Sequence, residues 1–100
     1  MIYQIVLKKS AQKHIDAHKR SGNDALCRKI ESLLLELEKH PREGTGKPEI
    51  LKGDLSGLWS RRIDREHRLV YSIEDTESSF RPTGREVVTV TVISAKGHYE

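Results

Sequence analysis

The chain has 100 residues, of which 35% are hydrophobic and 33% are charged, with a formal net charge of +3. This length predicts one domain spanning residues 1–100, and the high charged share favours a small, ligand-facing domain over a large enzyme with a deep pocket. The small positive excess weakly favours a polyanionic partner, either nucleic acid or an acidic protein segment.

The single cysteine, Cys27, cannot form an internal disulfide, which suits a reducing compartment. We interpret it as a small buried hydrophobe rather than as a nucleophile. No segment approaches the length of a membrane span, and the first ten residues do not read as a signal peptide. We therefore expect a cytoplasmic protein without membrane contact.

The N-terminal part of the chain predicts a strand and then a helix. Ile2 to Leu7 is apolar and β-branched, which is typical of a strand. Ser10 is expected to cap a helix over Ala11 to Arg20, which ends at a Ser-Gly pair.

A second helix is expected to be capped by Asn23 or Asp24 and to end near His40, because Pro41 cannot continue it. Its apolar residues fall on one face at helical spacing: Leu26, Ile30, Leu33, Leu34 and Leu37. This face is most simply part of the core, and a helix that binds a partner is the alternative.

The C-terminal half predicts strands. Residues 41–57 read as a loop rich in glycine and proline, with a short extended piece at Glu49 to Leu51. Leu58 to Ile73 reads as a β-hairpin, residues 74–86 as a long polar connection, and Val87 to Ala95 as a strand. The predicted fold is α+β, with two N-terminal helices packed on one face of a small antiparallel sheet.

The hairpin carries positive charge within its strands, and alternation separates its two faces. Odd positions are expected to face the helices, with Arg61 as the exception: Trp59, Ile63, Leu69, Tyr71 and Ile73. Even positions are expected to face solvent or a ligand, with Leu58 and Val70 mixed in: Ser60, Arg62, Arg68 and Ser72.

A three-residue loop, Asp64 to Glu66, keeps this apolar face intact and places Arg62 opposite Arg68. The same register places Trp59 opposite Tyr71. Facing arginines repel unless an anion lies between them, so they indicate either an anion site or two solvated side chains that lean apart.

Two other sequence patterns are weaker indications of function. The GTGK sequence at Gly44 to Lys47 lacks the upstream glycine and the following Ser or Thr of a phosphate-binding loop. His14 and His18 have a spacing that can hold zinc, but no further cluster completes a site, so we interpret them as a surface pair. We expect no metal and no cofactor.

Glu49 lies between two lysines and can act as a base, or it is simply an ion-paired loop residue. His98 is either a terminal histidine without a role or, if the preceding strand fixes it, an acid, because imidazole titrates near ~6.5. A base, an acid and arginines on one sheet face are the groups that RNA cleavage requires.

The block from Gly46 to Ile73, GKPEILKGDLSGLWSRRIDREHRLVYSI, resembles the signature of the YoeB/Txe branch of RelE-type toxins. The His-Tyr pair at residues 98 and 99 also matches, whereas the helical N-terminal half agrees only in layout. Members of this family are toxins of type II toxin–antitoxin systems. The resemblance implies a microbial-RNase-like fold and a ribosome-dependent mRNA endoribonuclease that cuts in the A site and inhibits translation.

The resemblance also implies roles for residues of this chain. Glu49 is expected to be the general base, His98 the general acid and Arg68 the catalytic residue that stabilises the transition state. Substrate binding is expected from three further residues: Arg62, Lys52 and Tyr99. Arg61 and Arg65 are expected to be supporting or surface charges.

The implied partners are a cognate YefM/Axe-like antitoxin whose flexible C-terminal part wraps the toxin, the ribosome with its mRNA, operator DNA bound through the antitoxin complex, and a second copy of the chain. Two other functions remain open from the residues alone. One is a non-catalytic RNA- or ribosome-binding module, and the other is a basic partner subunit of an acidic protein.

Two features depart from the family pattern. The connection over residues 74–86 is longer than the usual short turn, and Glu100 follows the tyrosine at which the family typically ends. Neither departure removes a matched catalytic residue.

Overall fold

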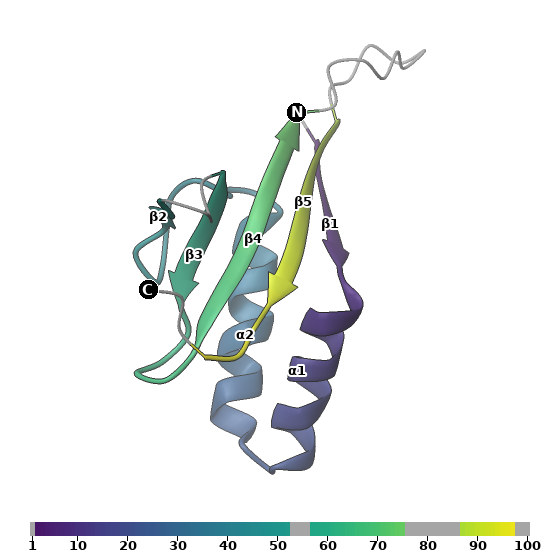
Figure 1. Ribbon diagram of the computed structural model, residues 1–100, viewed down its shortest axis with the longest axis vertical. Helices are drawn as coiled ribbons and strands as arrows, with labels where there is room; N and C mark the ends of the chain where they lie inside the picture. The colour runs from purple at the N-terminus through teal and green to yellow at the C-terminus, as the bar shows by residue number, and fades with distance from the viewer. Residues whose placement is uncertain (1, 53–56, 76–86, 98–100) are drawn as a thin grey trace.

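The computed structural model describes residues 2–52, 57–75 and 87–97. Within these residues the chain forms two helices and a five-stranded sheet (Figure 1). The elements, in chain order, are β1 (Ile2–Leu7), α1 (Lys9–Arg20), α2 (Asp24–Leu37), β2 (Glu49–Ile50), β3 (Leu58–Arg62), β4 (Arg68–Asp75) and β5 (Val87–Ser94).

The sheet has the strand order β1-β5-β4-β3-β2. Its pairings are antiparallel except that β1 runs parallel to β5, so the sheet is mixed rather than wholly antiparallel as the sequence predicted. A parallel pair requires a long connection between its strands, and both helices lie in the chain between β1 and β5.

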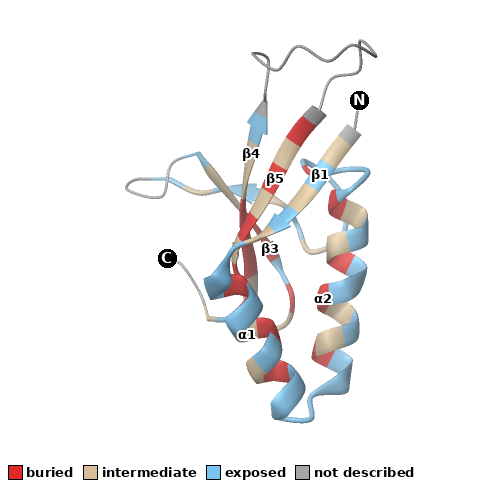
Figure 2. Ribbon diagram, turned by 90° about the vertical axis from the view of Figure 1, so that its right-hand side faces the viewer, coloured by how far each residue is buried: buried red, intermediate tan, exposed pale blue. Residues whose placement is uncertain are grey.

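Both helices pack against one face of this sheet, which confirms the predicted fold class. Buried positions recur along each helix on the side that meets the strands (Figure 2). The helices contribute Ala11, Ile15, Leu26, Ile30, Leu33 and Leu37 to the core, and the strands contribute Leu69, Tyr71, Val90 and Val92. The predicted stripe on α2 is therefore core, with Leu34 partly buried against it, and full burial of a Leu or Ile side chain favours folding by roughly 1.5–3 kcal/mol.

The two helix starts differ in how well the sequence predicted them. Asn23 caps α2, because its side chain accepts a hydrogen bond of 3.2 Å from the N–H of Leu26. Ser10 does not precede α1 but lies inside it, and its hydroxyl donates to the carbonyl of Ile93 in β5. The expected cap is therefore a tertiary contact between helix and sheet.

The end of α2 also differs from the expectation. The helix ends at Leu37 rather than near His40, and the chain continues as a turn in which the N–H groups of Lys39 and His40 both bond to the carbonyl of Glu36. In the part of the chain that is described, neither helix has the length and apolar character to cross a membrane.

Candidate active site

The β3–β4 hairpin places Arg62 directly opposite Arg68, as predicted. The loop between the strands has the predicted three residues, and the N–H of Ile63 closes it by donating to the carbonyl of His67 at 3.0 Å. Asp64 supports this turn, since its carboxylate accepts two backbone N–H groups within the loop. The register of the hairpin is therefore fixed by both its turn and its apolar pattern.

The even-numbered face of the hairpin is not uniformly open. Arg62 is exposed and Arg68 is half-buried, but Ser60 and Val70 have no exposed surface. The Arg68 guanidinium partly accounts for this, because its Nη1 donates to the Ser60 hydroxyl at 3.3 Å and so lies over that residue. The face expected to meet solvent or a ligand thus has accessible arginines, Arg62 and Arg68, beside two residues that are fully buried, Ser60 and Val70.

Glu49 reaches the same face through β2. In the sheet Glu49 pairs with Ser60, so the two side chains lie on the same side. The Oε2 atom of Glu49 lies 3.9 Å from Nη1 of Arg68, and the two side chains are 59% and 20% exposed. An ion pair this exposed contributes only about 0–1 kcal/mol to stability, so both groups remain available for other interactions.

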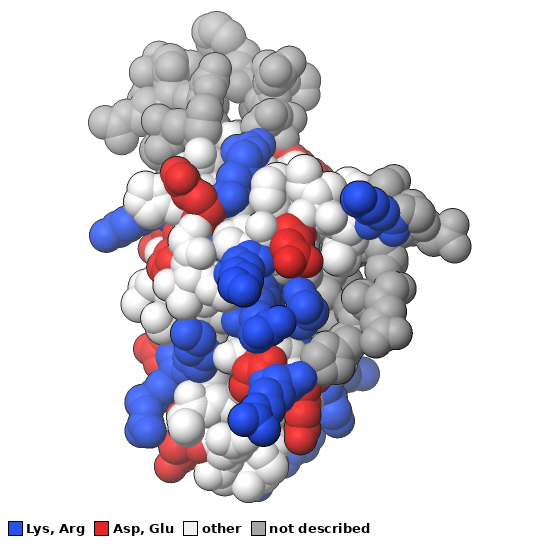
Figure 3. All heavy atoms as spheres, turned by 90° about the vertical axis from the view of Figure 1, so that its left-hand side faces the viewer, with Lys and Arg blue, Asp and Glu red and all other residues white. Residues whose placement is uncertain are grey.

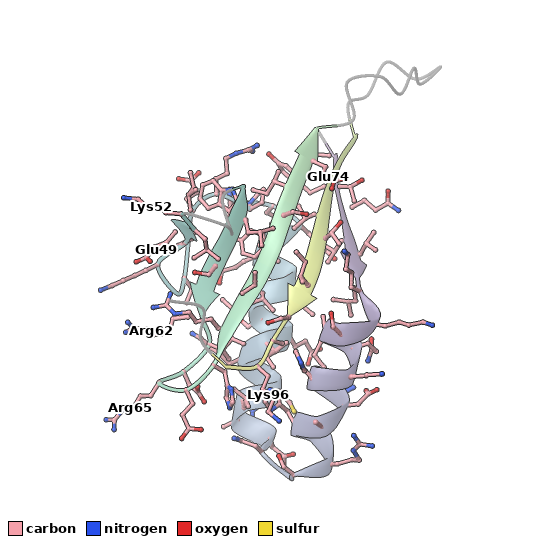
Figure 4. The ribbon with its side chains drawn as sticks, viewed as in Figure 1. Glu49, Lys52, Arg62, Arg65, Glu74 and Lys96 are labelled. Carbon is pink, nitrogen blue, oxygen red and sulfur yellow. The ribbon has the colours of Figure 1, made fainter. Side chains whose placement is uncertain are left out.

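Lys52 and Arg62 lie near Glu49, on the edge formed by β2 and β3. Figure 4 shows Glu49, Lys52 and Arg62 along this side of the molecule, with Arg65 at the tip of the hairpin. Figure 3 faces this edge and shows Lys and Arg side chains gathered in the middle of the surface, with acidic side chains among them. We define Glu49, Lys52, Arg62 and Arg68 as the β2–β3 edge site.

Arg61 points to the opposite face and is fully buried. Its Nε donates to the Tyr71 hydroxyl at 3.1 Å, and its Nη2 donates to the carbonyls of His40 and Glu43. Its Nη1 lies 3.6 Å from Oε1 of Glu36. Of the two roles expected for Arg61, supporting or surface charge, the structure shows the supporting one.

These contacts of Arg61 fix the loop that leads to β2. The Tyr71 hydroxyl donates to the carbonyl of Pro41 at 2.8 Å, and burial raises the pKa of that phenol. The N–H of Thr45 donates to Glu36 at 3.0 Å and lowers the pKa of that carboxyl, an effect to which Arg61 adds. The loop is therefore held at several points before it reaches Glu49.

Gly46 completes this attachment. Its carbonyl accepts the N–H of Arg62 at 2.7 Å, and its φ of +85° is one that residues with a side chain rarely adopt. A Cβ at this position would lie 2.6 Å from the carbonyl oxygen of Arg62. Close approach of the loop to β3 thus requires glycine three residues before Glu49.

The end of β5 meets the same hairpin at Gly97, whose carbonyl accepts the backbone N–H of Arg68 at 3.0 Å. The predicted acid, His98, and the predicted RNA-binding residue, Tyr99, follow directly and lie outside the described residues, as does Glu100. The structure therefore brings together Glu49, Arg62 and Arg68 but does not test the positions of His98 and Tyr99.

The expectation of a surface histidine pair at His14 and His18 was wrong. His18 is buried, and its Nε2 lies 2.9 Å from the carbonyl oxygen of Ala95. His14 is half-buried, and its Nδ1 accepts the N–H of Ala95 at 3.1 Å. Among the described residues, no group of three or more His, Cys, Asp or Glu side chains is placed to hold a metal ion.

One residue of this region was missed by the sequence reasoning. Ser60 orients Arg68, and nothing in its local sequence sets it apart from an ordinary strand serine. Arg61 had a usable signal, since it was the one charged residue on the apolar face of the hairpin, and such a residue is buried only with partners.

The sequence was compared with known families and proteins. Residues 11–99 match a family described as "YoeB-like toxin of bacterial type II toxin-antitoxin system". Toxin RelK of Mycobacterium tuberculosis is 47% identical over 73 residues, which cover 73% of this chain and 72% of that protein. Toxin YoeB of Streptomyces coelicolor is 40% identical over 82% of this chain and 83% of the relative.

Solved structures agree with this relationship. A YoeB/ParE toxin from Agrobacterium tumefaciens matches with a TM-score of 0.77 and 33% identity, over 96% of this chain and 99% of that one. The YoeB–YefM complex from Staphylococcus aureus matches with a TM-score of 0.73 and 33% identity, over 97% and 98% of the two chains. The chain belongs to the YoeB-like toxin family of bacterial type II toxin–antitoxin systems.

Proposed function

We propose that this toxin is a ribosome-dependent endoribonuclease that cuts mRNA in the ribosomal A site and so inhibits translation. The observation that carries the proposal is the β2–β3 edge site, where the Glu49 carboxylate and the Arg68 guanidinium lie 3.9 Å apart with Arg62 beside them. A carboxylate next to paired arginines is the arrangement required to deprotonate a hydroxyl beside a phosphate and to neutralise the charge that develops.

In this mechanism Glu49 takes the proton from the ribose 2′-hydroxyl, and the 2′-oxygen attacks the adjacent phosphorus. Arg68 stabilises the negative charge on the phosphoryl oxygens, assisted by Arg62, and Lys52 contacts phosphate. The bond from phosphorus to the 5′-oxygen breaks, and His98 supplies the proton to that leaving oxygen, while Tyr99 positions the RNA. The products are a 2′,3′-cyclic phosphate and a new 5′-hydroxyl end.

The openness of the site supports a requirement for the ribosome. Glu49 is 59% exposed and Arg62 is exposed, so this face alone cannot exclude water from the reacting groups. Precise orientation of the reacting atoms supplies much of the acceleration in such reactions. We propose that the ribosome supplies this orientation by holding the mRNA in the A site. The toxin would then act where ribosomes are, in the cytoplasm.

The proposed partners follow from related proteins. Staphylococcus aureus YoeB has been solved as a dimer and in a heterotetrameric complex with YefM. We infer that this toxin likewise pairs with a YefM-like antitoxin whose C-terminal segment covers the β2–β3 edge site. We further infer that it forms a homodimer, and that the complex with antitoxin binds operator DNA.

A reconstituted translation system tests this function. Purified toxin should cut ribosome-bound mRNA within A-site codons and leave the same mRNA intact when ribosomes are omitted. Uncut transcripts on toxin-bound ribosomes would instead identify a silent ribosome-binding module. An absence of ribosome binding together with tight binding to the neighbouring gene's acidic product would identify a partner subunit.

A further inference from the structure

Three histidines, two from α1 and one from the β3–β4 hairpin, make hydrogen bonds to the backbone just after β5. His14 and His18 lie one turn apart on α1 and bind both backbone groups of Ala95, through the 3.1 Å and 2.9 Å contacts described above. Ala95 has no exposed surface, and the bond from His18 is buried while the bond to His14 is partly buried. These bonds fix the backbone of this residue rather than its small side chain.

The third histidine, His67, acts two residues further on. Its Nδ1 accepts the N–H of Gly97 at 3.1 Å, while the N–H of the neighbouring Arg68 donates to the Gly97 carbonyl at 3.0 Å. Gly97 has a φ of +80°, which lets the backbone turn into this position. Both backbone groups of Gly97 are therefore held by consecutive residues at the start of β4.

The histidines that bind Ala95 and the histidine that binds Gly97 are in contact through their rings. The rings of His18 and His67 have centroids 4.7 Å apart and are tilted by 59°. A shift of the hairpin relative to α1 would therefore disturb the bonds to Ala95 and Gly97 together. We name His14, His18 and His67 the histidine clamp.

The clamp requires defined protonation states. His14 and His67 accept at Nδ1, so each ring must carry its proton on Nε2 and be neutral, and the Nε2 of His67 faces the Glu66 carboxylate at 3.8 Å. His18 must carry a proton on Nε2 to donate to Ala95. Burial, then the positive charge of Lys96 and then the other two clamp rings lower the pKa of His14, which keeps it an acceptor near neutral pH.

We propose that the histidine clamp positions the catalytic C-terminus: it fixes Ala95 to Gly97 against Arg68, and thereby sets the point from which the chain continues to His98. The inference rests on the proposed nuclease function, because it assigns His98 as the acid. The clamp histidines are positioning residues, since they bind backbone and do not contact the reacting atoms.

The position of the clamp explains why three side chains converge on so short a segment. His98 follows Gly97 by one peptide, and Gly97 is hydrogen-bonded to the residue that stabilises the transition state. A general acid must lie within hydrogen-bonding reach of the leaving oxygen, and small displacements of such groups have large effects on rate. Acidification should release the bond to Ala95, because a protonated His14 has no acceptor atom at Nδ1 and then faces the positive charge of Lys96.

Paired substitutions of His67 test the clamp. His67→Leu removes the acceptor, whereas His67→Asn keeps a side-chain oxygen near the place of Nδ1. His67→Leu should cut ribosome-bound mRNA about 10- to 100-fold more slowly, as expected for a misplaced catalytic group, while ribosome affinity stays unchanged. His67→Asn should recover most of the rate, and the exposed His40→Leu is the matched control that should match wild type.

The pH dependence of the cleavage rate is a second measurement, and it does not require that the protein fold with leucine at position 67. The variant His14→Asn should keep its cleavage rate to lower pH than wild type, because the acceptor whose protonation breaks the bond to Ala95 is gone. An unchanged acid limb, or a His67→Leu variant that is folded and cleaves at the wild-type rate, would overturn the proposal.

Amide exchange separates failure of the clamp from failure of the nuclease proposal. The N–H of Gly97 should be protected from exchange in wild type and in His67→Asn. In His67→Leu it should exchange about 5-fold faster or more, because one hydrogen bond is lost. Wild-type protein that protects Gly97 but never cuts mRNA would overturn the nuclease function and with it the catalytic role of the clamp. Equal exchange in all three proteins would overturn the clamp itself.

Discussion

The Glu49 carboxylate and the Arg68 guanidinium, which come from segments 19 residues apart in the sequence, lie 3.9 Å from each other on one face of the sheet. Two pairings produce this contact: β2 aligns Glu49 with Ser60, and the β3–β4 hairpin aligns Arg68 with Arg62. Because the Glu49 side chain is 59% exposed and the two groups are 3.9 Å apart, the ion pair contributes little to stability, which favours a role in binding or chemistry.

Arg68 should not be replaceable by lysine. Arg68→Lys keeps the charge but loses the planar guanidinium, whose Nη1 lies against both Ser60 and Glu49 and whose other N–H groups can bind phosphoryl oxygens, so we expect cleavage of ribosome-bound mRNA to fall by about 10²-fold or more. Single-turnover rates measured on ribosomes test this. Arg20→Lys, at the end of α1, is the matched control, and equal losses in both variants would contradict the role given to Arg68.

Arg61 should matter for stability rather than for chemistry. Arg61→Met removes hydrogen bonds to Tyr71, His40 and Glu43 from a fully buried position, and we expect the free energy of unfolding to fall by about 2–4 kcal/mol. Urea denaturation measures the change. The exposed neighbour should behave differently: Arg62→Met should change stability by less than about 0.5 kcal/mol.

Gly46→Ala should damage both the fold and the site. The alanine Cβ would meet the carbonyl oxygen of Arg62 at 2.6 Å at a φ of +85°, so we expect a loss of about 1–3 kcal/mol in unfolding free energy. Because this loop leads to Glu49, the cleavage rate should fall even at temperatures where the variant is folded. Gly22→Ala is a useful comparison, since a Cβ at Gly22 meets no atom within 4 Å although its φ is also positive; a cleavage defect of the same size there would remove the link to Glu49.

Stability should decrease on the acidic side because of His14. The pKa of His14 in the folded protein lies below its ordinary value of 6.5, so the unfolded chain binds this proton more readily. The contribution of His14 is thus fully present above pH 6.5 and is lost as the pH falls through the lower folded pKa. Denaturation at pH 7.5 and at pH 5 should show a smaller decrease for His14→Asn than for wild type, and a steeper decrease in the variant would reverse the assigned direction.

The hairpin was predictable in detail because its information is local. Alternation along each strand and a turn of suitable length fix one register, and that register placed Arg62 opposite Arg68 and Trp59 opposite Tyr71. Asn23 was predictable as a cap for the same reason, since its partner lies three residues away.

Features that depend on distant partners were not predictable. The hydroxyl of Ser10 binds Ile93, 83 residues away, instead of capping its helix. His14 and His18 face the end of β5 rather than solvent, and Arg61 is buried by carbonyl groups of a loop some twenty residues earlier. The sequence names such polar residues but does not reveal which remote backbone group will satisfy them.

The rate at which Glu49→Gln cuts ribosome-bound mRNA tests the nuclease account most directly. The side chain is largely exposed, so glutamine should preserve the fold and ribosome binding, while removal of the base should slow cleavage by about 10²- to 10⁴-fold. Glu31→Gln, an exposed change on α2, should cleave at the wild-type rate. A folded Glu49→Gln protein that binds ribosomes and cuts mRNA as fast as wild type would contradict the assignment of the β2–β3 edge site as the active site.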